Sequence, residues 1–119
     1  MKFAGQGAED VAVAVLSSLG GLRVGATGPG VGQAKSDIEF HQTLRQGREV
    51  VVQPWRRLGD LKSVADAHHG HIMLFVGRGG RFYAFTDPDS RLYDLGSFPA
   101  AMEKLLLGLD FGPALAPDP

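Results

Sequence analysis

The stretch that decides the fold runs from residue 80 to residue 108 and reads GRFYAFTDPDSRLYDLGSFPAAMEKLLLG. A turn at Asp87-Pro88-Asp89-Ser90 divides two strand-like segments, since a type I turn favours aspartate first and proline second. Ser97 can then cap a helix that tolerates Pro99 near its start and ends at a glycine. The stretch consists of strand formers, turn formers and an apolar helix face, so it describes a scaffold or a binding surface.

Upstream of this stretch, Ile72–Val76 is apolar at every position, which predicts a central strand covered on both faces. The glycine-rich connection at residues 77–80 is short, so the next strand should pair back antiparallel. Residues Ile72–Val76, Arg81–Thr86 and Arg91–Leu95 are therefore predicted to form a three-stranded meander.

Near the N-terminus, the apolar residues of Ala8–Leu19 recur at helical spacing. Glu9 and Asp10 fall in the first turn, where the helix dipole favours negative charge, and two glycines end the helix. A short strand follows at Leu22–Val24, and Ser36–Gln42 is extended or weakly alternating.

Together these elements predict a single α+β domain over residues 1–119: a twisted antiparallel sheet with an N-terminal and a C-terminal helix packed on it. The ordered core is expected at about 8–111. Residues 112–119 contain three prolines and are predicted to be a flexible tail. Residues 48–58 stay ambiguous, because Val50–Val52 favours a strand while Trp55 and Leu58 could continue a helical face.

Composition limits the classes of function. Twelve basic and thirteen acidic residues nearly cancel, so no whole-molecule field attracts nucleic acid or anionic lipid. The chain has no cysteine, which excludes disulfides and thiolate chemistry. Neither a signal peptide nor a membrane-spanning run is recognised, so we expect a cytoplasmic protein without nucleic-acid or membrane partners.

Two motifs invite a ligand-binding interpretation. Residues 28–36, GPGVGQAKS, place Pro29 and Ala34 where a phosphate-binding loop needs glycines, so a surface loop is favoured. The run from His68 to His71 contains three imidazoles and could hold a metal ion through His69 and His71, which share a face in an extended chain. Asp66 or His41 could add a ligand. A solvated loop before a buried strand remains the favoured interpretation of this run.

Charged residues separate along the sequence. The middle is basic, and a nucleic-acid interface there would use Trp55 for stacking; the contributing residues are Arg45, Arg48, Arg56, Arg57 and Lys62. The last third is acidic, through Asp87, Asp89, Asp94, Glu103 and Asp110. Carboxylates of this kind can speed encounter with a cationic protein. Paired carboxylates can also act as general acid and base. The pair Glu9 and Asp10 suits a helix start better, and the pair Asp87 and Asp89 suits a turn better.

The residues also resemble a known family. VLSSLGGLRV at residues 15–24 is similar to the entry helix of the SUKH superfamily, which ends in two glycines and a short strand. The segments GRFY at 80–83, LGS at 95–97 and the helix at 101–108 resemble the closing elements of its third subfamily. Members of the superfamily share an α+β fold, and in bacteria most are immunity proteins encoded beside polymorphic toxins, many of them nucleases or deaminases.

The resemblance implies a non-catalytic protein that binds and blocks a cognate toxin without a cofactor, and it favours a helix near residues 48–58. We predict partner contacts at Asp66, Asp87, Asp89, Arg91 and Asp94. A metal- or ligand-binding protein using His69 and His71, or a structural adaptor, remains the alternative. The identity of the toxin and the oligomeric state are left open by the sequence.

Overall fold

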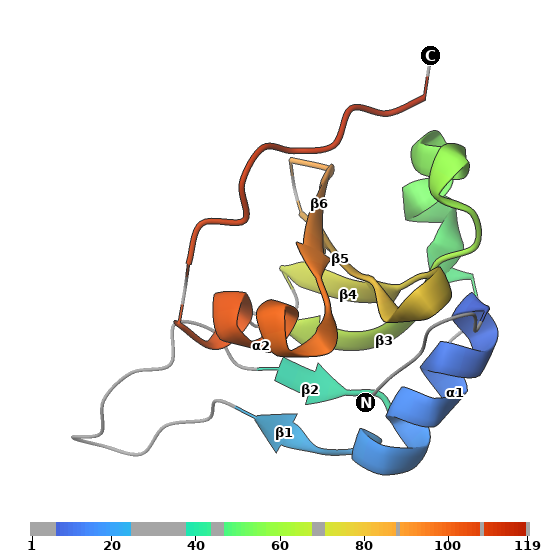
Figure 1. Cartoon of the computed structure of the whole chain (residues 1–119), viewed down its shortest axis with the longest axis vertical. Helices are drawn as coiled ribbons and strands as arrows, with labels where there is room; N and C mark the ends of the chain where they lie inside the picture. The colour runs from blue at the N-terminus through green and yellow to red at the C-terminus, as the bar shows by residue number, and fades with distance from the viewer. Residues whose placement is uncertain are drawn as a thin grey trace.

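Within the residues that the structure describes (7–24, 38–43, 47–67, 71–87, 89–107 and 109–118), a six-stranded antiparallel sheet organises the chain (Figure 1). In this computed structural model the strands neighbour one another in the order of the sequence. They are β1 (Arg23–Val24), β2 (Ile38–Phe40), β3 (Lys62–Ala67), β4 (Ile72–Val76), β5 (Phe82–Thr86) and β6 (Arg91–Gly96). The helices are α1 (Ala8–Leu19), α2 (Phe98–Leu107) and the 3-10 helices η1 (Arg48–Leu58) and η3 (Arg78–Gly80).

Helix α1 has the predicted bounds, and its buried side chains lie on one stripe. The helix stops because the chain turns sharply at Gly20, whose N–H donates to the Leu16 carbonyl at 2.8 Å. A Cβ at Gly20 would lie 2.5 Å from that same carbonyl oxygen, so only glycine fits there. Gly21 then takes a φ of 81°, which glycine adopts at little cost, and leads the chain into β1.

Both faces of the sheet are covered, which gives the molecule three layers. Alternate residues of β4 and β5 point to opposite sides, as the period of a strand requires. One face packs against α1 and α2, with Leu74 and Phe82 in its cluster. The other face packs against η1 and the C-terminal segment, with Phe75 and Phe85 in its cluster. The predicted α+β fold, with a helix from each end of the chain packed on an antiparallel sheet, is therefore confirmed.

The sheet is larger than the predicted three-stranded meander because β3 inserts between β2 and β4. Its sequence, KSVADA, lacks the usual signal for a strand, since alanine and aspartate are poor strand formers. An irregularity in its pairing between Ser63 and Ala65 also breaks the alternation. The small side chains of Ala65 and Ala67 are fully or almost fully buried in the cluster that α1 covers.

Residues 48–58 form the helix η1, so the strand suggested by Val50–Val52 does not form. The helix is broken at Trp55, whose φ of −111° and ψ of 44° are not helical, directly after Pro54. Proline lacks the N–H that a continuous helix needs, which accounts for the kink. The kink allows Val52 and Trp55 to be buried against the sheet.

The C-terminal segment is an ordered part of the fold, where the sequence predicts a flexible tail at 112–119. After α2 the chain runs along β6 and reaches η1 (Figure 1). Leu115 packs in the cluster on the η1 face, and its N–H donates to the Leu92 carbonyl of β6 at 2.8 Å. The three prolines indicated mobility, but the Leu115 side chain, the Arg57–Asp118 ion pair and main-chain hydrogen bonds hold the segment.

Candidate protein-binding surface

The hairpin between β5 and β6 ends in an acidic turn whose backbone is held in place. Ser90 adopts a φ of 55°, and its N–H donates to the Thr86 carbonyl at 2.9 Å. The Thr86 hydroxyl donates to Asp89 Oδ1 at 2.6 Å. The Asp87 N–H donates to the His71 carbonyl at 2.9 Å, which ties the turn to the start of β4. The turn therefore holds the Asp89 carboxylate and the Asp87 backbone in place, and both aspartate side chains are exposed.

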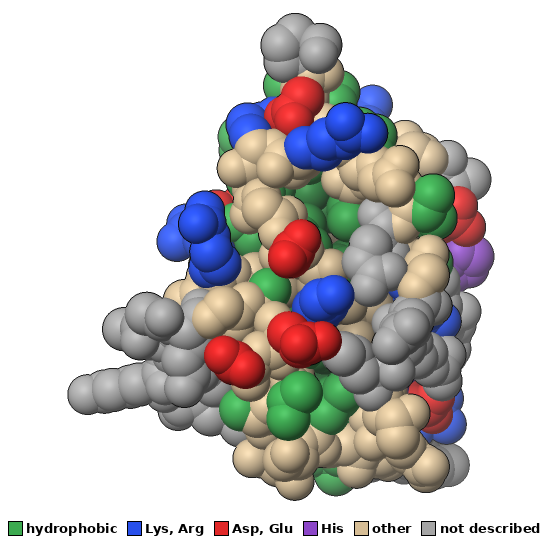
Figure 2. Space-filling view, turned by 90° about the vertical axis from the view of Figure 1, so that its right-hand side faces the viewer, with side chains coloured by type: hydrophobic (Ala, Val, Ile, Leu, Met, Phe, Trp, Pro, Cys, Tyr) green, Lys and Arg blue, Asp and Glu red, His purple; other side chains and the backbone are tan. Residues whose placement is uncertain are grey.

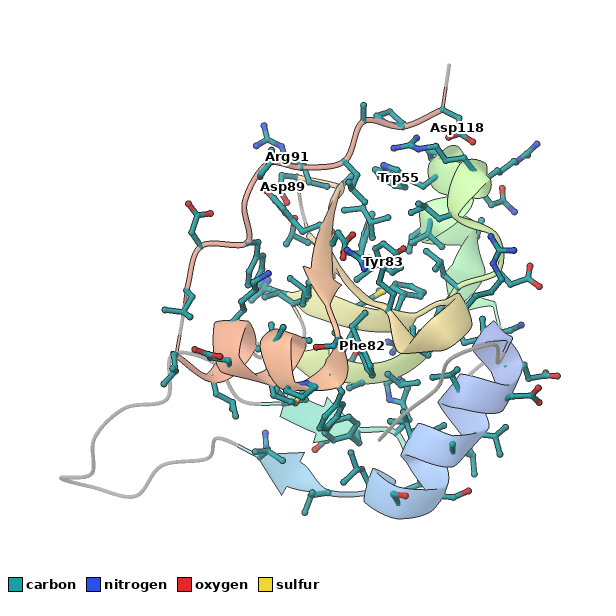
Figure 3. All side chains as sticks on the ribbon, viewed as in Figure 1. Trp55, Phe82, Tyr83, Asp89, Arg91 and Asp118 are labelled. Carbon is teal, nitrogen blue, oxygen red and sulfur yellow. The ribbon has the colours of Figure 1, made fainter. Side chains whose placement is uncertain are left out.

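Arg91 is the cation closest in sequence to these carboxylates. Its Nε lies 3.8 Å from Asp89 Oδ2, and the two side chains are 62% and 48% exposed. A pair this exposed contributes little to stability and is easily exchanged for a pair with another molecule. Asp89 and Arg91 lie together at the end of the hairpin in Figure 3.

A hollow of about 300 Å³ opens beside the acidic turn. Tyr93 and Phe111 lie within its lining, with their rings edge to face at a centroid distance of 5.5 Å. Asp110 stands at its margin and accepts a hydrogen bond from the Gly112 N–H at 2.9 Å. We call this surface the acidic end; its residues are Thr86, Asp87, Asp89, Arg91, Tyr93, Leu109, Asp110, Phe111 and Gly112.

The other two predicted partner-binding residues lie away from the acidic end, on the sheet face that carries η1. The Asp66 carboxylate of β3 accepts hydrogen bonds from both terminal guanidinium nitrogens of Arg48, at 2.5 Å and 3.4 Å. The Asp94 carboxylate of β6 accepts hydrogen bonds from Arg81 Nε at 2.7 Å and from the Gly96 N–H at 2.9 Å. Of the five predicted residues, the structure thus brings three together and places these two in ion pairs within the fold.

Asp94 also sets the electrostatics of its surroundings. Its hydrogen bond and its charge raise the pKa of Arg81 above the ordinary value, so this cation stays charged throughout the accessible pH range. Burial raises the pKa of Tyr83, and the nearby Asp94 carboxylate raises it further. Tyr83 therefore remains a neutral phenol at physiological pH.

Several predicted features fall outside the described residues: the loop at 28–36, the centre of the turn at Pro88, and positions 68–70 with His68 and His69. His71 is described and lies exposed at the start of β4. His41, considered as a further ligand, is buried, and its Nε2 shares a hydrogen bond of 3.0 Å with Ser63 Oγ. Among the described residues, no three His, Asp or Glu side chains gather where they could hold a metal ion.

Two cations from the basic middle of the sequence, of which the structure describes all but Arg45, are held in ion pairs. Arg48 pairs with Asp66, and Arg57 pairs with Asp118 at 2.8 Å. Figure 2 shows basic, acidic and apolar side chains interspersed on the side of the molecule that carries η1 and α1. Trp55 is 4% exposed and donates its indole N–H to the Leu115 carbonyl, so it offers no open ring for a base to stack on.

Comparison of the chain with known protein families, with curated proteins and with solved structures finds no match. The resemblance to the SUKH superfamily therefore depends on the sequence motifs quoted above. In the part of the chain that the structure describes, neither α-helix has the length and apolar character to cross a membrane.

Proposed function

We propose that this protein is a non-catalytic immunity protein of the cytoplasm, which binds a basic protein toxin through the acidic end and blocks its active site. The observation that carries the proposal is that exposed carboxylates from two separate segments lie beside one hollow, which Asp110 lines and which Thr86 lines at the base of the acidic turn. Asp87 and Asp89 come from the β5–β6 hairpin, whereas Asp110 follows α2.

This arrangement suits a cationic protein surface for two physical reasons. Carboxylates that are exposed and held in place attract a basic partner over about one Debye length, roughly 8–10 Å at physiological salt. The hollow between them can take an apolar or aliphatic side chain, and buried anchors of this kind supply most of the affinity of an interface. A nuclease offers such a surface, because it binds phosphates with lysine and arginine.

The fold supports the same interpretation. The resemblance to the SUKH superfamily implies an α+β domain with an entry helix and a closing helix, and the chain has this architecture. Two polar side chains of the acidic end make local structural bonds: Thr86 binds Asp89 within the turn, and Asp110 accepts the Gly112 N–H after α2. The exposed carboxylates then act by recognition and charge, without a reaction of their own.

The test uses the protein encoded by the adjacent reading frame as the partner. The double variant Asp87→Lys/Asp89→Lys should weaken binding, measured by calorimetry, by about tenfold or more at low salt. The matched control Asp60→Lys/Glu103→Lys makes the same change of charge at exposed residues outside the acidic end and should bind like the native chain. Equal affinity of both variants would remove the acidic end from the interface.

A separate experiment tests the function itself. Cells that produce the toxin should survive when the native chain is co-expressed and lose this protection with Asp87→Lys/Asp89→Lys. If the native chain neither binds the neighbouring protein nor protects cells, the immunity function is wrong, whichever surface is involved.

A further inference from the structure

The C-terminal segment passes β6 and reaches η1 (Figure 3), and it is hydrogen-bonded to both elements in the manner of a bound peptide. We call the surface that holds it, between Leu92 of β6 and Trp55 of η1, the groove. The backbone of Leu115 is held from both sides of this groove. Its N–H donates to the Leu92 carbonyl at 2.8 Å, and its carbonyl accepts the indole N–H of Trp55 at 2.8 Å. Main-chain bonds of this kind do not depend on the side chain of the bound segment, so they give affinity to any extended chain.

The side chain of Leu115 provides an apolar anchor. It packs against the cluster that contains Trp55, Phe85 and Leu92, in which the Trp55 and Phe85 rings meet edge to face at 6.2 Å. This cluster is part of the rigid sheet face, so the pocket for the anchor is formed by the fold itself.

Three residues further along, Asp118 is held at three points. Its N–H donates to the Pro54 carbonyl at 2.6 Å. Its carboxylate accepts the Arg57 N–H at 3.0 Å and the Arg57 guanidinium at 2.8 Å. Trp55, whose backbone is not helical, lies between these two bonded groups. The kink there leaves the Pro54 carbonyl and the Arg57 N–H directed at the segment. Charge-assisted hydrogen bonds make the position selective for a carboxylate.

Between these two anchors the segment makes little contact with the rest of the molecule. Ala116 and Pro117 are exposed, and the proline favours the extended backbone that the groove requires. The recognised pattern is thus an apolar residue, two residues that include a proline, and an acidic residue. Here this pattern is Leu115-Ala116-Pro117-Asp118.

A hollow adjoins the groove at Asp118. This hollow of about 440 Å³ is lined by Val50, Gln53, Pro54, Arg56 and Asp118. Val50 is 61% exposed, and Arg56 is exposed at the same hollow. A longer segment could therefore place a second carboxylate on Arg56 and an apolar side chain on Val50, contacts that Asp118 alone does not make.

We propose that this groove is a recognition site for an extended segment of a partner protein, with an apolar residue three positions before an acidic one and a further acidic residue nearby. The chain's own segment occupies the groove as an internal competitor. A tethered competitor has an effective concentration in the millimolar range, so a free segment must bind through additional contacts to displace it. This site is separate from the acidic end and does not depend on the proposed function.

The test uses a fluorescently labelled peptide with the sequence of residues 111–119 and the full-length chain. In the variant Leu115→Ala/Asp118→Ala the internal segment binds weakly, so the peptide should bind at least about tenfold more tightly than it binds the native chain. Adding Arg57→Ala to that variant should remove the gain. Trp55 is the one tryptophan of the sequence, so its fluorescence should change on binding as an independent signal.

A peptide in which aspartate replaces the anchor leucine is the matched control and should not bind. If the double variant is unfolded by circular dichroism, the single variant Asp118→Ala, which removes the ion pair and the hydrogen bond to the Arg57 N–H but leaves the Leu115 anchor, serves in its place. Failure of the peptide to bind a folded variant saturably would overturn the proposal. So would a dimer of the native chain that Leu115→Ala/Asp118→Ala abolishes, because the groove would then serve a second copy of the chain.

Discussion

Replacing Leu115 with alanine measures how much the C-terminal segment contributes to the fold. The leucine side chain is partly buried against the cluster on the η1 face. A fully buried leucine loses about 2–5 kcal/mol on truncation to alanine. Because part of this side chain already contacts water, we expect the free energy of unfolding to fall by about 1–2 kcal/mol. In a domain of this size, the melting temperature should then drop by roughly 3–8 °C.

The assay is urea unfolding followed by far-ultraviolet circular dichroism and by the fluorescence of Trp55, which contacts the segment directly. The matched control is Leu107→Ala, the same substitution at a side chain of α2 that is 57% exposed, where a change within about 0.5 kcal/mol is expected. If both variants are equally stable, the segment does not hold to the sheet, and the flexible tail predicted from its prolines is the better description.

Two further predictions concern the sheet and the end of α1. Because the pKa of Tyr83 is raised in the folded state, its contribution to stability is fully present below about pH 10 and is lost as the pH rises above that value. Urea unfolding at alkaline pH should show this loss in the native chain and less of it in Tyr83→Phe; an equal loss in both would contradict the assignment. The variant Gly20→Ala should lower the free energy of unfolding by about 1–3 kcal/mol, because its Cβ would meet the Leu16 carbonyl oxygen at 2.5 Å. Gly7→Ala, where a Cβ meets nothing within 4 Å, is the control, and equal thermal stability of the two variants would show that the close contact at Gly20 is absent.

The elements that the sequence predicted well are those whose signals are local. The buried residues of α1 recur every three to four positions. The chain after the helix turns at two glycines, of which Gly21 has a positive φ that other residues rarely adopt. The strands β4, β5 and β6 follow one another with short turns, so their pairing needs no distant information. Local propensity and tertiary structure agree in these segments, which is why composition and spacing were sufficient.

The elements that were missed or left open depend on distant partners. The strand β3 is stabilised by its position between two other strands and by the approach of α1 to its small side chains, none of which its own sequence reveals. Helix η1 was ambiguous because Val50–Val52 favours a strand, while burial of Val52 and Trp55 decides for the kinked helix.

The candidate site shows the same division. The acidic turn with Asp87 and Asp89 could be found from its turn chemistry, and Arg91 follows it directly. Asp66 looked equally available in the sequence, but its partner Arg48 is 18 residues away, so their pairing appears only in three dimensions. Leu115 gave no usable signal, because a single leucine among alanine and proline indicates neither a helix nor a strand.

The dependence of partner binding on salt tests the acidic end most directly. If the protein of the adjacent reading frame is the partner, as proposed, its dissociation constant from the chain should rise steeply between about 0.05 and 0.5 M NaCl, because screening weakens attraction between exposed charges. In Asp87→Lys/Asp89→Lys the dissociation constant should change little with salt concentration, or should fall as salt is added. The same steep slope in the native chain and in this variant would show that the carboxylates of the acidic turn do not face the partner.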